Sequence, residues 1–248
     1  PLISWGFHHY FHGRLTKYDL DKISSIRPII VIHRSFHEFI LNTPAMDLLG
    51  INKNTFKDIE VDEHLANFDD GHFSERGAII VLPRLMHLLA APAELIQGLQ
   101  KTKDYLHSNG ITLIGNPGAM YNKDLQLAKN SIFGNINSPF ESYFFPSALN
   151  LSEQFELNEV LNAAKEQTSW GGGKLNYLSK HIKLFADGAM YSQNMVMRDG
   201  YLDNHQGSWL MSLDTYENLF KIFWDDGYQI HIHQNGDAAL DRLLTTLE

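Results

Sequence analysis

The amino-acid sequence predicts an α/β protein in which helices cover a parallel sheet, and two observations support this. From about residue 93 onward, segments with helical spacing of apolar residues alternate with short strand-like segments. The connections between the strands are also long enough for the right-handed crossovers that parallel strands need. We therefore expect residues 93–248 to form this part, and residues 1–92 to form a separate mixed α/β region.

The composition is that of an ordinary globular protein, with 44% hydrophobic and 20% charged residues among 248. A net charge of -9 argues against nucleic acid and anionic membranes as partners. No apolar run approaches the roughly 18 residues of a membrane-spanning helix. Cysteine is absent, which excludes disulfides and thiolate ligands and fits a reducing compartment. We expect a cytoplasmic protein, and the net charge says little about its substrate.

The region of residues 1–92 shows a helix signal in the segment NTPAMDLLGI. Asn42 or Thr43 can cap this helix, Pro44 suits its first turn, and Gly50 ends it. Residues 52–75 are polar and are expected to be rich in loops. A further strand and a further helix are expected at residues 29–32 and 79–89.

The region of residues 93–248 contains the alternating elements. The helix after Ser212 is the clearest, because apolar residues recur at helical spacing until Gly227 ends it. The segment GGGK at residues 171–174 is expected to be a flexible joint, since no Lys-Ser/Thr pair follows it as in a phosphate-binding loop. Strands are expected at residues 111–114, 142–145, 181–188 and 228–234, and helices at 93–107, 156–167, 212–226 and from 237.

Two of these strands carry polar residues on one face, because side chains alternate along a strand. In HIKLFADG the polar face holds Lys183 and Asp187, and in YQIHIHQN it holds His231 and His233. A sheet with one face in water is the ordinary explanation. Parallel strands between helices normally bury both faces, however, so this polar face would point into a barrel interior or a cleft. Buried lysine and histidine need partners or a cation, which makes these residues candidates for a site.

Five segments, in this order, resemble family 3 amidohydrolases, a branch of the metal-dependent hydrolases that includes N-substituted formamide deformylases. They are ISWGF (3–7), HEFILNTPAMDLLGI (37–51), IKLFADGAM (182–190), YLDNHQGSW (201–209) and HIHQNGDAAL (231–240). The resemblance covers nearly the whole chain. One position departs from the family pattern, because a block that usually reads Gly-His reads Phe36-His37 here.

The resemblance implies a (β/α)8 TIM barrel with one or two divalent metal ions, commonly zinc. This chain would hold about strands 2–5 of the barrel, preceded by a mixed α/β insertion. Lys183 matches the fourth-strand lysine ligand, which can be carboxylated, and His233 matches the fifth-strand histidine ligand. A neutral imidazole suits zinc, and a partly buried lysine loses its charge readily. A salt bridge from Lys183 to Asp187 or to a neighbouring strand is the alternative.

Four other residues have expected roles near this site. The resemblance implies that His37 and Asp187 contact the substrate, and that His231 supports the metal ligands without being one. Asp237 either orients a ligand or caps the last helix. His8, His9 and His12 could bind metal, but without a regular spacing they are interpreted as surface histidines.

The function implied by the resemblance is metal-dependent hydrolysis of an amide-type C–N bond. The family's first-strand His-x-His would lie before Pro1, and its sixth-strand histidine and eighth-strand aspartate after Glu248. We therefore expect an internal fragment that is inactive alone and that forms homo-oligomers through its open sheet edges. The alternatives are a non-enzymatic or degenerate barrel that binds a small polar ligand, and a phosphate-binding barrel that uses GGGK.

Overall fold

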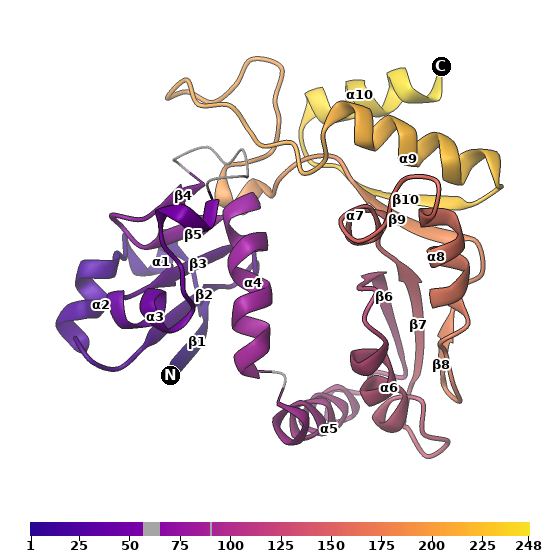
Figure 1. Ribbon diagram of the computed structural model, residues 1–248, viewed down its shortest axis with the longest axis horizontal. Coiled ribbons are helices and arrows are strands. Elements are labelled where there is room, and N and C mark those ends of the chain that lie inside the picture. The colour runs from indigo at the N-terminus through magenta and orange to yellow at the C-terminus, as the bar shows by residue number, and fades with distance from the viewer. Residues whose placement is uncertain (57–64, 90) are drawn as a thin grey trace. The chain divides into compact units, whose positions relative to one another are not determined.

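The computed structural model describes residues 1–56, 65–89 and 91–248 (Figure 1). These residues form two compact units. Unit 1 comprises Pro1–Leu89 and Gly188–Leu210, and unit 2 comprises Ala90–Asp187 and Met211–Glu248. The chain thus returns to unit 1 after the strand near residue 185, which the sequence did not indicate. The predicted insertion and barrel regions, 1–92 and 93–248, stay predictions.

Unit 1 is built on a five-stranded sheet in the order β1-β2-β3-β5-β4, in which only β1 and β2 pair in parallel. One face packs against α4, and Val81 and Leu85 of this helix share a buried core with Phe39 and Phe73 of the sheet. The strands are β1 (Leu2–Phe7), β2 (Ile29–His33), β3 (Glu38–Leu41), β4 (Ala66–Asn67) and β5 (His72–Ser74). The helices are α1 (His9–His12), α2 (Lys17–Ile23), α3 (Thr43–Leu48), α4 (Arg76–Leu89), η1 (Lys53–Phe56) and η2 (Met190–Ser192).

The predicted elements of unit 1 are confirmed. The strand at 29–32 is β2, and the helix at 79–89 is α4. The NTPAMDLLGI helix is α3, and Asn42 caps it by accepting a hydrogen bond from the Ala45 N–H at 3.0 Å. The segment predicted to be rich in loops contains η1, β4 and β5, and its residues 57–64 lie outside the described residues.

Unit 2 alternates helices with parallel strands, as predicted. The strands β6, β7 and β8 form one parallel sheet, and β9 and β10 form another. A parallel bridge between Ser147 and Lys183 connects the end of β7 to β9. The strands are β6 (Leu113–Ala119), β7 (Glu141–Pro146), β8 (Leu175–Tyr177), β9 (His181–Phe185) and β10 (Gln229–His233). The helices are α5 (Pro92–Ser108), α6 (Lys123–Ile132), α7 (Ala148–Ser152), α8 (Val160–Thr168), α9 (Leu213–Asp225) and α10 (Asp237–Leu247).

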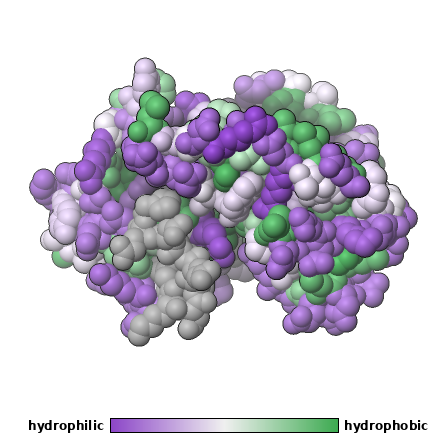
Figure 2. All heavy atoms as spheres, turned by 90° about the horizontal axis from the view of Figure 1, so that it is seen from above, coloured by the Kyte–Doolittle hydropathy of each residue, from purple (hydrophilic) through white to green (hydrophobic). Residues whose placement is uncertain are grey.

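These observations establish a mixed α/β fold with open sheets, and the described strands of unit 2 do not close into a barrel. The assignment of the unit to barrel strands 2–5 therefore stays a prediction. Within the described residues, no single helix has both the length and the apolar character to cross a membrane, although α4 and α5 taken together would meet that criterion. Apolar and polar side chains are mixed on the face seen in Figure 2.

The alternating pattern of β9 is the feature that positions the candidate site. Ile182 and Leu184 are fully buried and share one core with Phe223 of α9, while the side chains on the other face are only partly buried. The apolar stripe of α9 and the apolar face of β9 thus bury each other, as the sequence predicted. This packing fixes which way the polar face of β9 points.

The GGGK segment is not a flexible joint, and that prediction was wrong. Gly173 has a φ of +60°, and a Cβ atom there would lie 1.8 Å from the Gly134 carbonyl oxygen. Only glycine tolerates both conditions. The Lys174 ammonium donates to the Ser138 carbonyl at 2.6 Å, so it is occupied within the fold. The segment is a tightly packed turn leading into β8, a strand that the sequence analysis missed along with α6.

Candidate metal and substrate site

The two predicted metal ligands of unit 2 lie on neighbouring parallel strands. The register pairs Lys183 of β9 with His231 of β10, and Phe185 with His233. Lys183 and His233 therefore lie on one face of the pair, with Lys183 in the middle of β9 and His233 at the carboxyl end of β10. The carboxyl ends of parallel strands are where α/β proteins bind their ligands. The structure brings these two residues together, as the sequence predicted, but their role as ligands stays a prediction.

Lys183 has an environment that favours its neutral amine. Its ammonium lies over the Phe185 ring, 5.2 Å from the ring centroid, and burial lowers its pKa. Among the residues that the structure describes, none forms an ion pair with Lys183. The alternative of a Lys183–Asp187 salt bridge is thus not formed. A lysine without a carboxylate partner is one that can give up its proton and react or bind a cation.

Asp187 is fully buried and binds backbone N–H groups. Its carboxylate accepts hydrogen bonds from the N–H groups of Asn235 at 2.9 Å and Gly236 at 2.8 Å. It thereby fixes the turn between β10 and α10, next to the positive end of the helix dipole. The Asp237 carboxylate accepts a local hydrogen bond from the Ala238 N–H at 3.0 Å, in the first turn of α10.

The two histidines of β10 have different partners. His231 contacts His181, with 2.8 Å between Nε2 and Nδ1, and stacks on Phe145 at 4.4 Å between ring centroids. Burial and then the charges of His181 and Lys183 lower the pKa of His231. His233 accepts a hydrogen bond at Nε2 from the side-chain amide of Asn235 at 2.9 Å. The contact with His181 thus holds the His231 ring, two residues before the end of β10, and Asn235 orients the His233 ring at the end of this strand.

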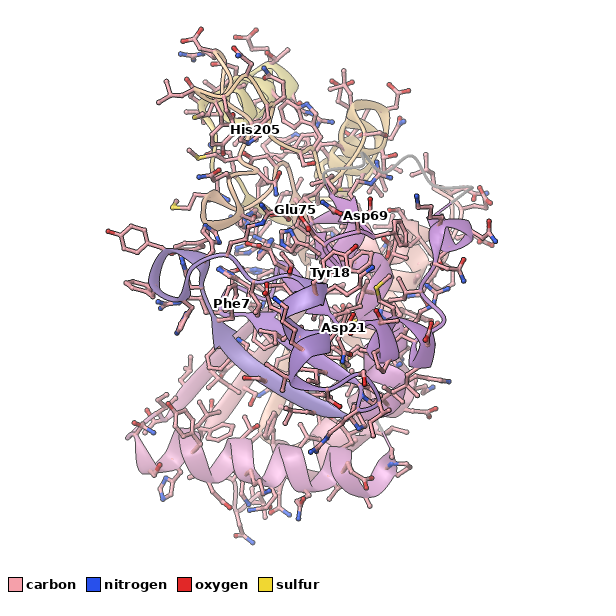
Figure 3. All side chains as sticks on the ribbon, turned by 90° about the vertical axis from the view of Figure 1, so that its left-hand side faces the viewer. Phe7, Tyr18, Asp21, Asp69, Glu75 and His205 are labelled. Carbon is pink, nitrogen blue, oxygen red and sulfur yellow. The ribbon has the colours of Figure 1, made fainter. Side chains whose placement is uncertain are left out.

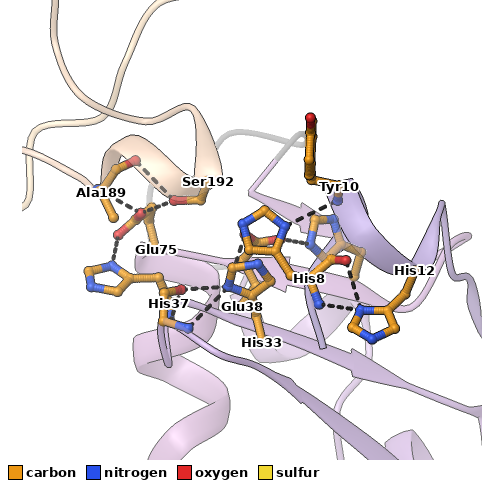
Figure 4. A network of polar contacts seen from close by, with 11 residues as sticks. His8, Tyr10, His12, His33, His37, Glu38, Glu75, Ala189 and Ser192 are labelled. Atoms are coloured by element: carbon orange, nitrogen blue, oxygen red, sulfur yellow. Dashed lines mark hydrogen bonds and ion pairs between the residues drawn. The ribbon is translucent and has the colours of Figure 1, made fainter. Parts of the chain in front are cut away.

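His37, in unit 1, is held by a buried glutamate. Its Nδ1 donates to the Glu75 carboxylate at 2.8 Å, and the Glu75 side chain is only 1% exposed. Glu75 also accepts hydrogen bonds from the Ala189 N–H at 3.0 Å and the Ser192 hydroxyl at 2.5 Å (Figures 3 and 4). Burial alone would lower the His37 pKa, but the hydrogen bond and charge of Glu75 outweigh it and raise the pKa. His37 is therefore a fixed imidazole that favours its charged form.

A second group of histidines lies elsewhere in unit 1. Over residues 1–56, 65–89 and 91–248, the three residues His8, His9 and His33 each place a ring nitrogen within 4.8 Å of the others. We call these three residues the histidine cluster (Figure 4). His12, grouped with His8 and His9 in the sequence, instead bonds the His8 backbone through Nδ1 at 2.9 Å. Interpreting His8 and His9 as scattered surface residues was therefore incomplete, because a buried histidine from β2 joins them.

Three residues of these networks escaped the sequence analysis. His33 ends a strand that reads as purely apolar, Glu38 begins β3, and Glu75 lies at a turn before α4. Their partners come from distant parts of the chain, such as Ser192 for Glu75. The sequence offered one signal for these networks. The apolar strand is followed by the run His-Arg-Ser-Phe-His at residues 33–37, which places polar groups at an edge of the core.

The arrangement is that of an α/β protein with polar groups at the carboxyl ends of parallel strands. The family model described as "Amidohydrolase family" matches residues 8–248, and the chain belongs to this family. Among curated proteins, the "Exoenzymes regulatory protein AepA" of Pectobacterium carotovorum subsp. carotovorum is 23% identical over 92% of this chain and 49% of its own length. The "Putative amidohydrolase YtcJ" of Bacillus subtilis (strain 168) is 21% identical over 94% and 43%.

Two solved structures share the fold. An uncharacterized metal-dependent hydrolase from Pyrococcus horikoshii OT3 matches 99% of this chain and 47% of its own, with a TM-score of 0.63 and 16% identity. Another from Pyrococcus furiosus matches 99% and 48%, with a TM-score of 0.60 and 20% identity. The chain thus spans about half the length of the relatives and structures that it matches. Both solved structures are described as metal-dependent hydrolases, and the histidine cluster of this chain suggests a metal ion, whose identity is not shown.

Proposed function

We propose that this chain is part of a zinc-dependent hydrolase that cleaves amide-type C–N bonds in small molecules. In this proposal β6, β7, β9 and β10 are about the second to fifth strands of a (β/α)8 barrel. The observation that carries it is the pair of Lys183 and His233 on adjacent parallel strands, within a chain of the amidohydrolase family. Lys183 forms no ion pair with any described residue, and His233 lies at the carboxyl end of β10, the end of the strands where such enzymes do chemistry.

The donor set fits part of a zinc site. The neutral amine of Lys183 can add to carbon dioxide, forming an N–C bond and releasing one proton from the nitrogen, which gives an anionic carbamate. A carbamate oxygen and the His233 imidazole are ligands that zinc accepts. A bound metal would acidify water and polarise the scissile carbonyl. Two donors are fewer than the three that a catalytic zinc takes from protein, so other residues would complete the set.

The neighbouring residues have positioning roles in this proposal. His231, held by His181, lies opposite Lys183 on the neighbouring strand, and Asn235 orients the His233 ring. Asp187 fixes the turn after His233 through two backbone N–H groups. Its direct contact with substrate, like that of His37, rests on the resemblance alone. Supporting contacts of this kind typically change metal affinity about 10–100-fold when they are removed.

The test uses the whole protein that the gene encodes. We expect one or two equivalents of zinc by elemental analysis and hydrolysis of N-substituted formamides or other small amides. Lys183→Ala should lose most of the metal and the activity, and acetate should restore part of both by replacing the carbamate. Lys221→Ala, which removes an exposed lysine of α9, is the matched control. Full zinc content and full activity in Lys183→Ala would contradict the proposal.

A second candidate is a ligand-binding module without catalysis. It is favoured by the name of one relative, an exoenzymes regulatory protein, which matches 92% of this chain. In that case the whole protein would bind a small polar molecule, detectable by calorimetry, but would not turn over any amide of the panel. Binding that persists in Lys183→Ala without loss of metal would favour this candidate.

A further inference from the structure

His33 of the histidine cluster has a ring nitrogen without a partner in a buried place. The residue is 2% exposed, and among the described residues none forms a hydrogen bond with its Nε2. Its Nδ1 accepts a hydrogen bond from the Ser35 N–H at 3.2 Å and lies 2.7 Å from the Ser35 hydroxyl oxygen. When Nδ1 carries the proton instead and donates a hydrogen bond to that hydroxyl oxygen, the Nε2 lone pair is available for a metal. Histidine ligands of metals commonly donate their other N–H in this way.

The other two histidines lie beside the His33 ring, at the start of α1. The ring centroids of His8 and His33 are 4.7 Å apart, and those of His9 and His33 are 5.8 Å apart. Nitrogen ligands of a tetrahedral zinc lie roughly 3.3 Å from each other, given Zn–N distances of about 2.0–2.1 Å. The donor atoms here lie within 4.8 Å. His9 is exposed, so a side-chain rotation of His9 can close much of this gap at little cost.

A buried carboxylate supplies charge that complements a cation at this place. Glu38 is 5% exposed, its Oε1 lies 3.8 Å from the His33 Nδ1, and this oxygen forms no hydrogen bond with any described residue. Its other oxygen accepts from His72 Nε2 at 2.8 Å. Glu38 and His9 also line one cavity of about 430 Å³ in unit 1, which gives a path from solvent. Negative charge without full compensation in a buried place stabilises a nearby cation.

We propose that the histidine cluster is a second metal site, for a first-row transition-metal ion such as Zn²⁺, that binds independently of Lys183 and His233. Three imidazoles are the ligands that such ions prefer over calcium and magnesium. Three protein ligands leave the fourth position of a tetrahedral ion to water or a small anion. Glu38 compensates the charge of the ion from behind His33.

Metal binding has a local consequence that can be measured at Tyr10. The His8 Nδ1 now accepts a hydrogen bond from the Tyr10 N–H at 3.1 Å, which caps α1. If Nδ1 binds the metal its lone pair is taken, and if Nε2 binds, Nδ1 of the neutral ring carries the proton. Either way this bond is lost. The Tyr10 amide should therefore exchange faster with solvent, or shift in an NMR spectrum, when metal binds.

The experiment titrates Zn²⁺ and Co²⁺ into the 248-residue chain. We expect one equivalent of Co²⁺ to give the intense visible absorption of a four-coordinate ion. His9→Ala should weaken Zn²⁺ binding by at least about 10-fold, in the range found when support for a zinc ligand is removed. His107→Ala, which removes an exposed histidine of α5, should change nothing. Lys183→Ala with His233→Ala should leave this equivalent bound.

Two results would overturn the site. One is equal zinc affinity of His9→Ala and the unchanged chain, and the other is loss of the bound equivalent in the Lys183→Ala, His233→Ala variant. Because His33 is buried, replacing it could unfold unit 1, so the test uses the exposed residue His9. His33→Gln is added only if the circular dichroism spectrum of that variant matches the spectrum of the unchanged chain. An unshifted Tyr10 amide in the zinc-loaded chain would also count against the site. Since neither result depends on hydrolysis, the site can fail while the proposed function stands.

Discussion

The two units treat their buried titratable groups differently. In unit 1, Glu75 accepts three hydrogen bonds, from His37, Ala189 and Ser192. In unit 2, the Lys183 ammonium lies over a phenyl ring, and none of the described residues pairs with its charge. A paired buried charge stabilises the fold only if its partners stay in place, whereas an unpaired one lowers stability and is retained for another reason. The comparison therefore separates Glu75, which we expect to stabilise unit 1, from Lys183, which we propose as a metal ligand.

The largest effect is expected for Glu75→Ala. The substitution leaves the His37 imidazole and the Ala189 N–H without their acceptor in a place where the carboxylate was 1% exposed. Breaking a buried pair in this way costs about 3–5 kcal/mol. Urea unfolding followed by tryptophan fluorescence measures the loss. Glu75→Gln keeps an acceptor oxygen and should lose less. A loss below about 1 kcal/mol would show that Glu75 does not hold unit 1 together.

The same pair predicts a dependence of stability on pH. Glu75 raises the pKa of His37 above its unfolded value, so folding favours the protonated imidazole. This contribution is complete below the unfolded pKa of about 6.5 and is lost as pH rises through the higher folded value. The free energy of unfolding should therefore fall across this window, and His37→Gln should remove that part of the fall. The same slope in the variant and the unchanged chain would contradict the pairing.

Sequence reasoning found the parallel strands and their helices because these depend on local patterns. The alternation of apolar and polar residues in HIKLFADG and the apolar stripe of α9 predict which faces are buried. Ile182 and Leu184 are indeed fully buried. The partners of Glu75 could not be found in this way, because His37 and Ser192 lie 38 and 117 residues from it. The wrong prediction for GGGK has the same cause, because the close contact that requires glycine at residue 173 is made with Gly134, which is distant in the sequence. Contacts between distant segments set these environments, and no local pattern encodes them.

Lys183→Met should have the opposite sign to Glu75→Ala. It removes an ammonium that burial penalises and replaces it with an apolar chain of similar length. We expect the 248-residue chain to unfold at the same urea concentration or to gain about 0.5–2 kcal/mol, as is common where a site sacrifices stability for function. Lys221→Met, on the exposed face of α9, is the control and should change little. A clear loss of stability in Lys183→Met would mean that Lys183 is a structural residue.

The smallest effect is expected at Phe36, where this chain departs from the Gly-His of the family block. Phe36 has a φ of +63°, which favours glycine, while its ring stacks on Trp5 with 5.7 Å between centroids. Phe36→Ala loses the ring and keeps the strained backbone, whereas Phe36→Gly loses the ring and relieves the strain. The strain of about 1–2 kcal/mol exceeds the entropy cost of glycine, so the Gly variant should be more stable by about 0.5–1 kcal/mol. Thermal unfolding of both variants measures the difference. A more stable Ala variant would mean that residue 36, in the turn before His37, adopts a backbone conformation that does not favour glycine.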